Sequence, residues 1–134
     1  MKRFKTILLL TLIALTMACG YSSKPAAPPA AGTMPTIAQL NPDSATAGGE
    51  AFTLTVTGTN FGAKAVVNWN GAAQTSNTTF VSGTEVTVAV PASAIMAAGT
   101  VQITVTNPGT PGTGMYGSGG TAAATSSPMA FTIN

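Results

Sequence analysis

The chain has 134 residues, a length that fits one domain with extensions. Charged residues are only 6% and hydrophobic residues 45% of it, and small polar residues fill most of the rest, so the composition excludes a disordered chain. The formal net charge of +2 depends on Lys2, Arg3 and Lys5, because without them two lysines stand against three carboxylates. We therefore expect neither a basic surface nor a nucleic-acid partner.

Residues 1–18 are predicted to be a cleaved export signal. Lys2, Arg3 and Lys5 form a positive start, and an apolar run rich in leucine and isoleucine extends from Thr6 to Met17. A run of about 12 residues is too short to cross a hydrocarbon core of about 30 Å as a helix. The combination of positive start, short apolar run and small residues is typical of a secretory signal.

The only cysteine, Cys19, ends the stretch Leu15-Thr16-Met17-Ala18-Cys19, which resembles a bacterial lipobox. The resemblance implies lipidation of the Cys19 thiol, cleavage after Ala18 and acylation of the new amine, with Thr16 standing where the usual pattern has leucine. The alternative is an ordinary signal peptide that leaves a free Cys19. Gly20 rather than aspartate follows the cysteine, which favours the outer membrane of the cell envelope.

Residues 19–34 are predicted to be the lipidated cysteine followed by a Pro/Ala-rich tether. Pro25, Pro28 and Pro29 lie among alanines and serines, without helical or alternating periodicity. Prolines favour an extended chain of about 3.1 Å per residue, so about 14 residues reach roughly 40 Å. The tether would lift a domain off a lipid surface.

Residues 35–134 are predicted to form one all-β domain. Apolar residues alternate there with threonine, alanine or glutamine, which is the period of a strand with one buried face and predicts antiparallel sheets. The alternating runs are 52–57, 67–69, 86–90, 101–106 and 131–133, and Ile37 and Leu40 indicate a first strand that ends at Pro42. Turn signals such as Asn70-Gly71 separate the runs. About seven short strands at this spacing predict an immunoglobulin-like antiparallel β-sandwich.

An ordered series of motifs resembles the IPT/TIG family of immunoglobulin-like domains over about 100 residues. The series comprises Pro35-Thr36-Ile37, Leu40-Asn41-Pro42, Ala47-Gly48-Gly49, Leu54-Thr55-Val56-Thr57-Gly58-Thr59-Asn60-Phe61, Val67-Asn68-Trp69-Asn70-Gly71, Val90-Pro91-Ala92, Gly99-Thr100-Val101, Val105-Thr106-Asn107-Pro108 and Phe131-Thr132-Ile133. These residues are interpreted as scaffold: Gly58 and Asn60 for positive φ angles in a turn, Phe61 as a core anchor and Pro91 as the end of a strand. The resemblance implies interaction rather than a reaction.

Residues 107–128 form a Gly/Ser-rich link that is long for a connection between the last two strands. Met115 and Tyr116 lie at its centre and are the candidate binding residues, because end loops of such sandwiches often carry recognition. The alternative is a flexible insertion with an incidental tyrosine.

Residues for catalysis and metal binding are scarce. The chain has no histidine, and of its three carboxylates only Asp43 and Glu50 fall close enough in sequence to suggest a weak calcium site, for which solvated loop charges are the better interpretation. We expect no enzyme activity, no metal and no cofactor. Trp69 is interpreted as a core residue, with an exposed sugar-stacking platform as the alternative.

The predicted function is that of a lipid-anchored envelope protein whose domain binds another protein or a ligand. The membrane is its partner through the lipid, and the second partner is an unknown envelope protein or polysaccharide. The alternatives are a structural spacer in an envelope complex and a carbohydrate-binding accessory module.

Overall fold

The computed structural model describes residues 30–113 and 119–134. Residues that alternate between apolar and polar in the sequence alternate between buried and exposed in the strands. In β3 (Phe52–Thr59), Leu54 and Val56 are fully buried whereas Thr53 and Thr57 are exposed. The same rule holds in β8 (Gly99–Asn107), where every second residue from Val101 onward faces the core. Each such strand covers one side of the core, so two sheets are needed to close it.

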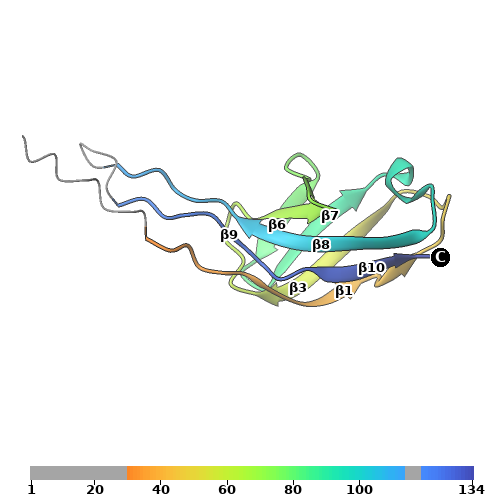
Figure 1. The fold of residues 1–134 in the computed structure, drawn as a ribbon, viewed down its shortest axis with the longest axis horizontal. Coiled ribbons are helices and arrows are strands. Elements are labelled where there is room, and N and C mark those ends of the chain that lie inside the picture. Colours follow the sequence, from red (N-terminus) through yellow and green to blue (C-terminus); the bar gives the residue numbers. More distant parts are fainter. Residues whose placement is uncertain (1–29, 114–118) are drawn as a thin grey trace, which may run out of the picture.

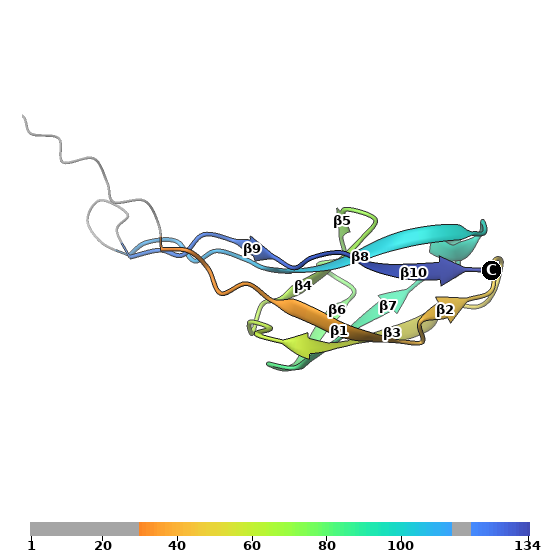
Figure 2. The same ribbon diagram turned by 60° about the horizontal axis from the view of Figure 1, so that its bottom comes forward.

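The two sheets pack face to face, as Figures 1 and 2 show. The first has the order β1-β3-β7-β6, with β1 at Thr36–Asn41, β7 at Glu85–Val90 and β6 at Thr78–Ser82. The second has the order β2-β10-β8-β4-β5 with β9 on β8, and its further strands are β2 (Ser44–Ala45), β10 (Met129–Ile133), β4 (Val66–Trp69), β5 (Ala72–Ala73) and β9 (Ala124–Thr125). Seven of these strands have four or more residues, as predicted.

Among the ladders between the strands β1 to β10 of the described residues, all but one are antiparallel. The exception is β2, which pairs with β10 in parallel through Ser44 and Thr132. After Pro42 the chain crosses from the first sheet to the second, so β2 lies beside β10 instead of continuing along β3. The expected purely antiparallel pattern is therefore correct for every ladder except this short one.

The strand β6 has no counterpart among the predicted runs. Its residues Thr78 and Phe80 lie opposite the buried Val88 and Val86 of β7, but a bulge between Phe80 and Ser82 interrupts the alternation. Phe80 is 37% exposed because β6 is the edge strand of its sheet. An edge strand with a bulge therefore lacks the alternation of apolar and polar residues by which strands are predicted from sequence.

The centre of the core is aromatic. Phe131 is fully buried and stacks on Phe52 with ring centroids 5.8 Å apart, while Trp69 tilts against it at 5.4 Å. Phe61 is buried at the other end of the core, which confirms its predicted role as an anchor. Pairs of this geometry contribute about 0.5–1.5 kcal/mol beyond the area that they bury.

The predicted turns are present, but one glycine has a different role from the one expected. Asn70 and Gly71 have φ angles of 48° and 84° and connect β4 to β5, and Asn60 has a φ of 61°. Gly58 is an extended residue of β3, where a Cβ atom would lie 1.9 Å from the carbonyl oxygen of Thr36. The interpretation of Gly58 as a positive-φ turn residue is wrong, because close approach of β1 requires the glycine.

Pro91 directly follows β7, as predicted, and precedes the short helix η1 (Ala92–Ile95). Ile95 is buried, and its carbonyl oxygen accepts a hydrogen bond from the amide of Gly48. This contact holds the η1 segment and the 46–50 loop together at the end of the sandwich where β10 ends. Met96 is 74% exposed at the same end.

Residues 107–113 and 119–125, which we call the arm, extend from the opposite end of the sandwich. Its two sides are paired: Asn107 lies opposite Ala124 in the β8–β9 ladder, and Thr110 forms an antiparallel bridge with Thr121. Residues 30–34, which we call the lead, run along the arm, with Ala30 in a parallel bridge with Thr121. The three segments run side by side away from the two sheets in both ribbon views (Figures 1 and 2).

Candidate functional site

The three predicted site residues, Cys19, Met115 and Tyr116, lie outside the described residues. The described parts of the 107–128 link are the two paired sides of the arm. The lead, expected to be the last part of the tether, is hydrogen-bonded to the arm. The candidate site is therefore built from these two segments and from the end of the sandwich that carries them.

Asn107, the last residue of β8, joins three segments at the base of the arm. Its Oδ1 accepts a hydrogen bond of 2.8 Å from the amide of Gly62, while its Nδ2 donates to the carbonyl oxygens of Thr33 and Asn60 at 2.9 and 2.8 Å. A side-chain amide has both donors and acceptors, so one residue satisfies three backbone groups of two other loops. Asn107 thereby attaches the lead to the sandwich.

The amide of Ala30 donates to the carbonyl oxygen of Gly120, and the carbonyl oxygen of Ala30 accepts from the amide of Ala122, at 3.0 and 2.8 Å. Gly32 approaches the other strand so closely that a Cβ atom would lie 2.1 Å from the carbonyl oxygen of Ala122. The lead and the arm therefore contact each other backbone to backbone, and small residues are what the contact requires.

A groove of about 760 Å³ lies at the base of the arm. The lead, the 60–64 loop and both sides of the arm line it, so most of its surface is backbone and small side chains. The side-chain Nδ2 of Asn60 donates to the carbonyl oxygen of Met34 at 3.4 Å on this side. Lys64 contributes the one basic side chain found in residues 30–113 and 119–134. Its volume is in the range of sites that hold small ligands or extended segments.

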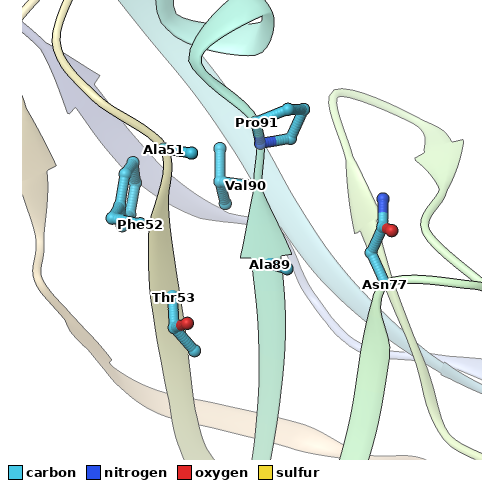
Figure 3. A pocket seen from close by; sticks show the side chains of 7 residues that line it. All are labelled: Ala51, Phe52, Thr53, Asn77, Ala89, Val90 and Pro91. Carbon is cyan, nitrogen blue, oxygen red and sulfur yellow. The ribbon is translucent and has the colours of Figure 1, made fainter.

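A second hollow of about 370 Å³ lies across β3 and β7. Its lining is Ala51, Phe52 and Thr53 from the start of β3, Ala89, Val90 and Pro91 from the end of β7, and Asn77 from the residue before β6 (Figure 3). The side chains supply a hydroxyl, an amide and apolar surface. We call it the end hollow.

Trp69 is half-buried and packs against the core. It borders a space of about 120 Å³ that shares Ala89, Val90 and Pro91 with the end hollow. This volume is below the roughly 300 Å³ at which ligand sites begin. The core interpretation of Trp69 is therefore supported, and the sugar-stacking platform is not.

Neither hollow contains an arrangement of groups for acid–base or metal chemistry. Asp43 accepts a bond of 3.2 Å from the neighbouring Ser44 hydroxyl, and Glu50 is exposed on a different loop. In the part of the chain that the structure describes, no three His, Cys, Asp or Glu residues lie close enough to hold a metal ion. The surfaces are suited to contacts through amides, hydroxyls and backbone groups.

The hydrogen bonds of Asn107 were not predicted from the sequence, although the residue lies in the motif Val105-Thr106-Asn107-Pro108. The available signal was its position directly after the alternating run 101–106, where an asparagine is free to bond to neighbouring backbone. No helix among residues 30–113 and 119–134 is long and apolar enough to cross a membrane.

Comparison with protein families gives one match: the model of the IPT/TIG domain matches residues 35–133. The match begins at Pro35, directly after the lead, and ends in the last residue of β10. It includes the arm. Comparisons with curated proteins and with solved structures found no match.

Proposed function

Because the chain belongs to the IPT/TIG family, whose immunoglobulin-like domains are non-enzymatic and often serve in binding, we propose that it is a lipid-anchored cell-envelope protein that binds a partner without catalysis. The observation that carries the binding function is the arm with the groove of about 760 Å³ at its base. A long paired connection of this kind is typical of functional loops on a rigid scaffold.

The anchor is proposed to be a set of acyl chains, palmitate among them, on Cys19. The support is the lipobox-like stretch that ends in Ala18-Cys19, after a positive start and a short apolar run. Several acyl chains hold a protein firmly, since each buried CH₂ contributes about 0.8 kcal/mol. The outer membrane is the proposed location.

The mass of the mature protein purified from envelopes tests the anchor. We expect a chain that begins at Cys19 and carries acyl groups, and a Cys19→Ser variant that leaves the membrane fraction. Ser22→Ala is the matched control and stays in it. A mature chain with an unmodified Cys19 contradicts the anchor.

The proposed partner is an envelope protein that contacts the arm, with Met115 and Tyr116 between its two described sides as the contact residues. Cross-linking on intact cells, followed by capture of the tagged protein and mass spectrometry, identifies it. We expect Met115→Ala and Tyr116→Ala to lose the cross-linked partner, while Phe80→Ala on the edge strand β6 of the first sheet retains it. Equal capture of the partner by all three variants contradicts a role of Met115 and Tyr116 in binding it.

A polysaccharide ligand is the second candidate, favoured by the size of the end hollow and by its hydroxyl and amide groups. Trp69 borders the adjoining space and is the only tryptophan, so its fluorescence reports on this region. Emission that changes on titration with envelope polysaccharide, and no longer does so in Asn77→Ala, supports the second candidate. Unchanged emission excludes it for the sugars tested.

A spacer in a fixed envelope complex is the third candidate, favoured by the lead that the arm holds in place. It predicts co-purification with constant partners and no ligand for the isolated domain. Loss of arm residues would then change the spacing of the complex and leave its composition unchanged.

A further inference from the structure

The lead enters the domain at the outer part of the arm. Ala30 is level with Gly120 and Thr121, and its two hydrogen bonds to Gly120 and Ala122 fix it there. The sandwich itself begins only at β1. The N-terminal segment therefore leaves the described domain from the arm and not from the base of β1.

This placement shortens the free chain between the anchor and the fold. Ten residues lie between Cys19 and Ala30, and the eleven Cα–Cα steps from one to the other reach at most about 38 Å when fully extended. Thr110 is level with Ala30 across Thr121, and the eleven steps from it to Gly99 at the start of β8 measure about 36 Å at 3.3 Å per residue. The loop that carries Met96 lies at the far end of this length (Figure 1). The far end of the domain can therefore reach the anchor only if the segment before Ala30 runs fully extended back along the domain.

The charged side chains also distinguish the two ends of the domain. The lead and the described parts of the arm contain no charged residue, and Lys64 at the base of the arm offsets Glu85 at the start of β7. Asp43 and Glu50 lie instead in the loops on either side of β2, toward the end where β10 stops. An anionic lipid surface repels that end and not the arm.

We infer that the arm is the surface of the domain that faces the lipid bilayer, so that the end with Met96, η1 and the 46–50 loop points away from the membrane. A protein partner that contacts the arm is then one that lies at the membrane surface. This inference rests on the lipid anchor proposed above. The lead acts as a positioning segment: by joining the arm, it fixes the place and direction in which the chain enters the domain.

The test uses the acylated full-length protein in vesicles of phosphatidylethanolamine and phosphatidylglycerol that contain nitroxide-labelled lipid. A fluorophore is attached to an introduced cysteine, in Thr113→Cys on the arm or in Ala97→Cys at the far end, since acylation blocks Cys19. We expect quenching at position 113 to be several-fold stronger than at position 97. Equal quenching, or stronger quenching at position 97, overturns the inference.

Gly32→Ala in each labelled protein tests the role of the lead. The added methyl group has no space beside the carbonyl oxygen of Ala122, so the lead separates from the arm and the segment between Cys19 and the sandwich grows from ten to fifteen residues. We expect the ratio of the two quenching values to fall toward one. Gly83→Ala, where the nearest atom to a Cβ lies at 3.8 Å, is the matched control and keeps the ratio.

A second release variant, Asn107→Ala, removes the bond to the carbonyl oxygen of Thr33 and covers the case in which Gly32→Ala does not fold. A ratio unchanged in both release variants overturns the role of the lead. The mass of the reconstituted protein separates the two proposals: a chain without acyl groups overturns the anchor, and with it this inference. An acylated chain with equal quenching overturns the orientation alone.

Discussion

The sandwich and the arm are both paired β structure, but different interactions hold them. In the sandwich, large side chains such as Phe131, Leu54 and Ile103 are completely buried between two sheets. In the arm, the residues are mostly glycine, alanine, proline and threonine, and pairs of backbone groups make the contacts. Burial of apolar area contributes about 25 cal/mol per Å², so the arm gains little from it.

The difference shows where each region is vulnerable. An isolated two-stranded ribbon is marginally stable in water, so the arm depends on the residues that join it to the sandwich. Asn107 makes this junction on one side, and Ser126 makes it on the other. The four substitutions below separate the two regions, and they are ordered by the size of the expected effect.

Phe131→Ala is expected to have the largest effect, a loss of about 3–5 kcal/mol in the free energy of unfolding, because it leaves a cavity in the core. It removes the contacts to Phe52 and Trp69 together. Urea denaturation followed by Trp69 fluorescence measures the loss. Phe80→Ala on the edge strand is the control, and a similar loss there would contradict the location of the core.

Gly58→Ala is expected to lower the free energy of unfolding by about 2–3 kcal/mol, within the range for overpacked sites. The added methyl group lies on the carbonyl oxygen of Thr36, so β1 must move away from β3. Thermal denaturation measures the effect, with Gly83→Ala as the control. Equal midpoints for the two variants would show that β1 does not approach β3 this closely.

Asn107→Ala is expected to cost about 1–3 kcal/mol, since the partially buried amide of Gly62 loses its acceptor. The change is confined to the base of the arm. Hydrogen exchange should accelerate at Ala30 and Ala122, and it should stay unchanged at Val56 in β3. Asn68→Ala, which loses only bonds to the hydroxyls of Thr104 and Thr106, is the control.

Ser126→Ala is expected to have the smallest effect, about 1 kcal/mol, because the hydroxyl no longer accepts a buried hydrogen bond from the amide of Val105 or donates a partly buried one to the carbonyl oxygen of Ser127. The backbone bond from the amide of Ser126 to the carbonyl oxygen of Val105 remains. Chemical denaturation measures the change against Ser127→Ala, whose side chain is exposed. A larger loss in the free energy of unfolding than that of Asn107→Ala would mean that Ser126 contributes more than Asn107 to the attachment of the arm.

Much of the sandwich was predictable from its sequence, because each long strand has one buried and one exposed face. The runs at 52–57, 86–90 and 101–106 alternate cleanly and correspond to β3, β7 and β8. The edge strand β6 was not predictable, since its bulge breaks the period. The role of Gly58 was not predictable either, because close approach of a second strand leaves no mark in local sequence.

The candidate site was predictable in part. The length and composition of residues 107–128 identified them as unusual, and the structure shows that their described parts form the two sides of the arm. Their pairing with the lead was not predictable, because backbone hydrogen bonds between small residues require no particular side-chain pattern. The same reason explains why the lead resembles a tether in sequence.

The parallel ladder of β2 and β10 affects the order of folding. Ser44 and Thr132 are 88 residues apart, and β10 lies between β2 and β8 in its sheet. Closing a loop of this length costs chain entropy before any contact repays it, so the second sheet is expected to form late and slowly. Because β10 carries the fully buried Phe131, the core cannot close until residues 129–133 have been synthesised, so folding of the second sheet has to follow translation of this strand.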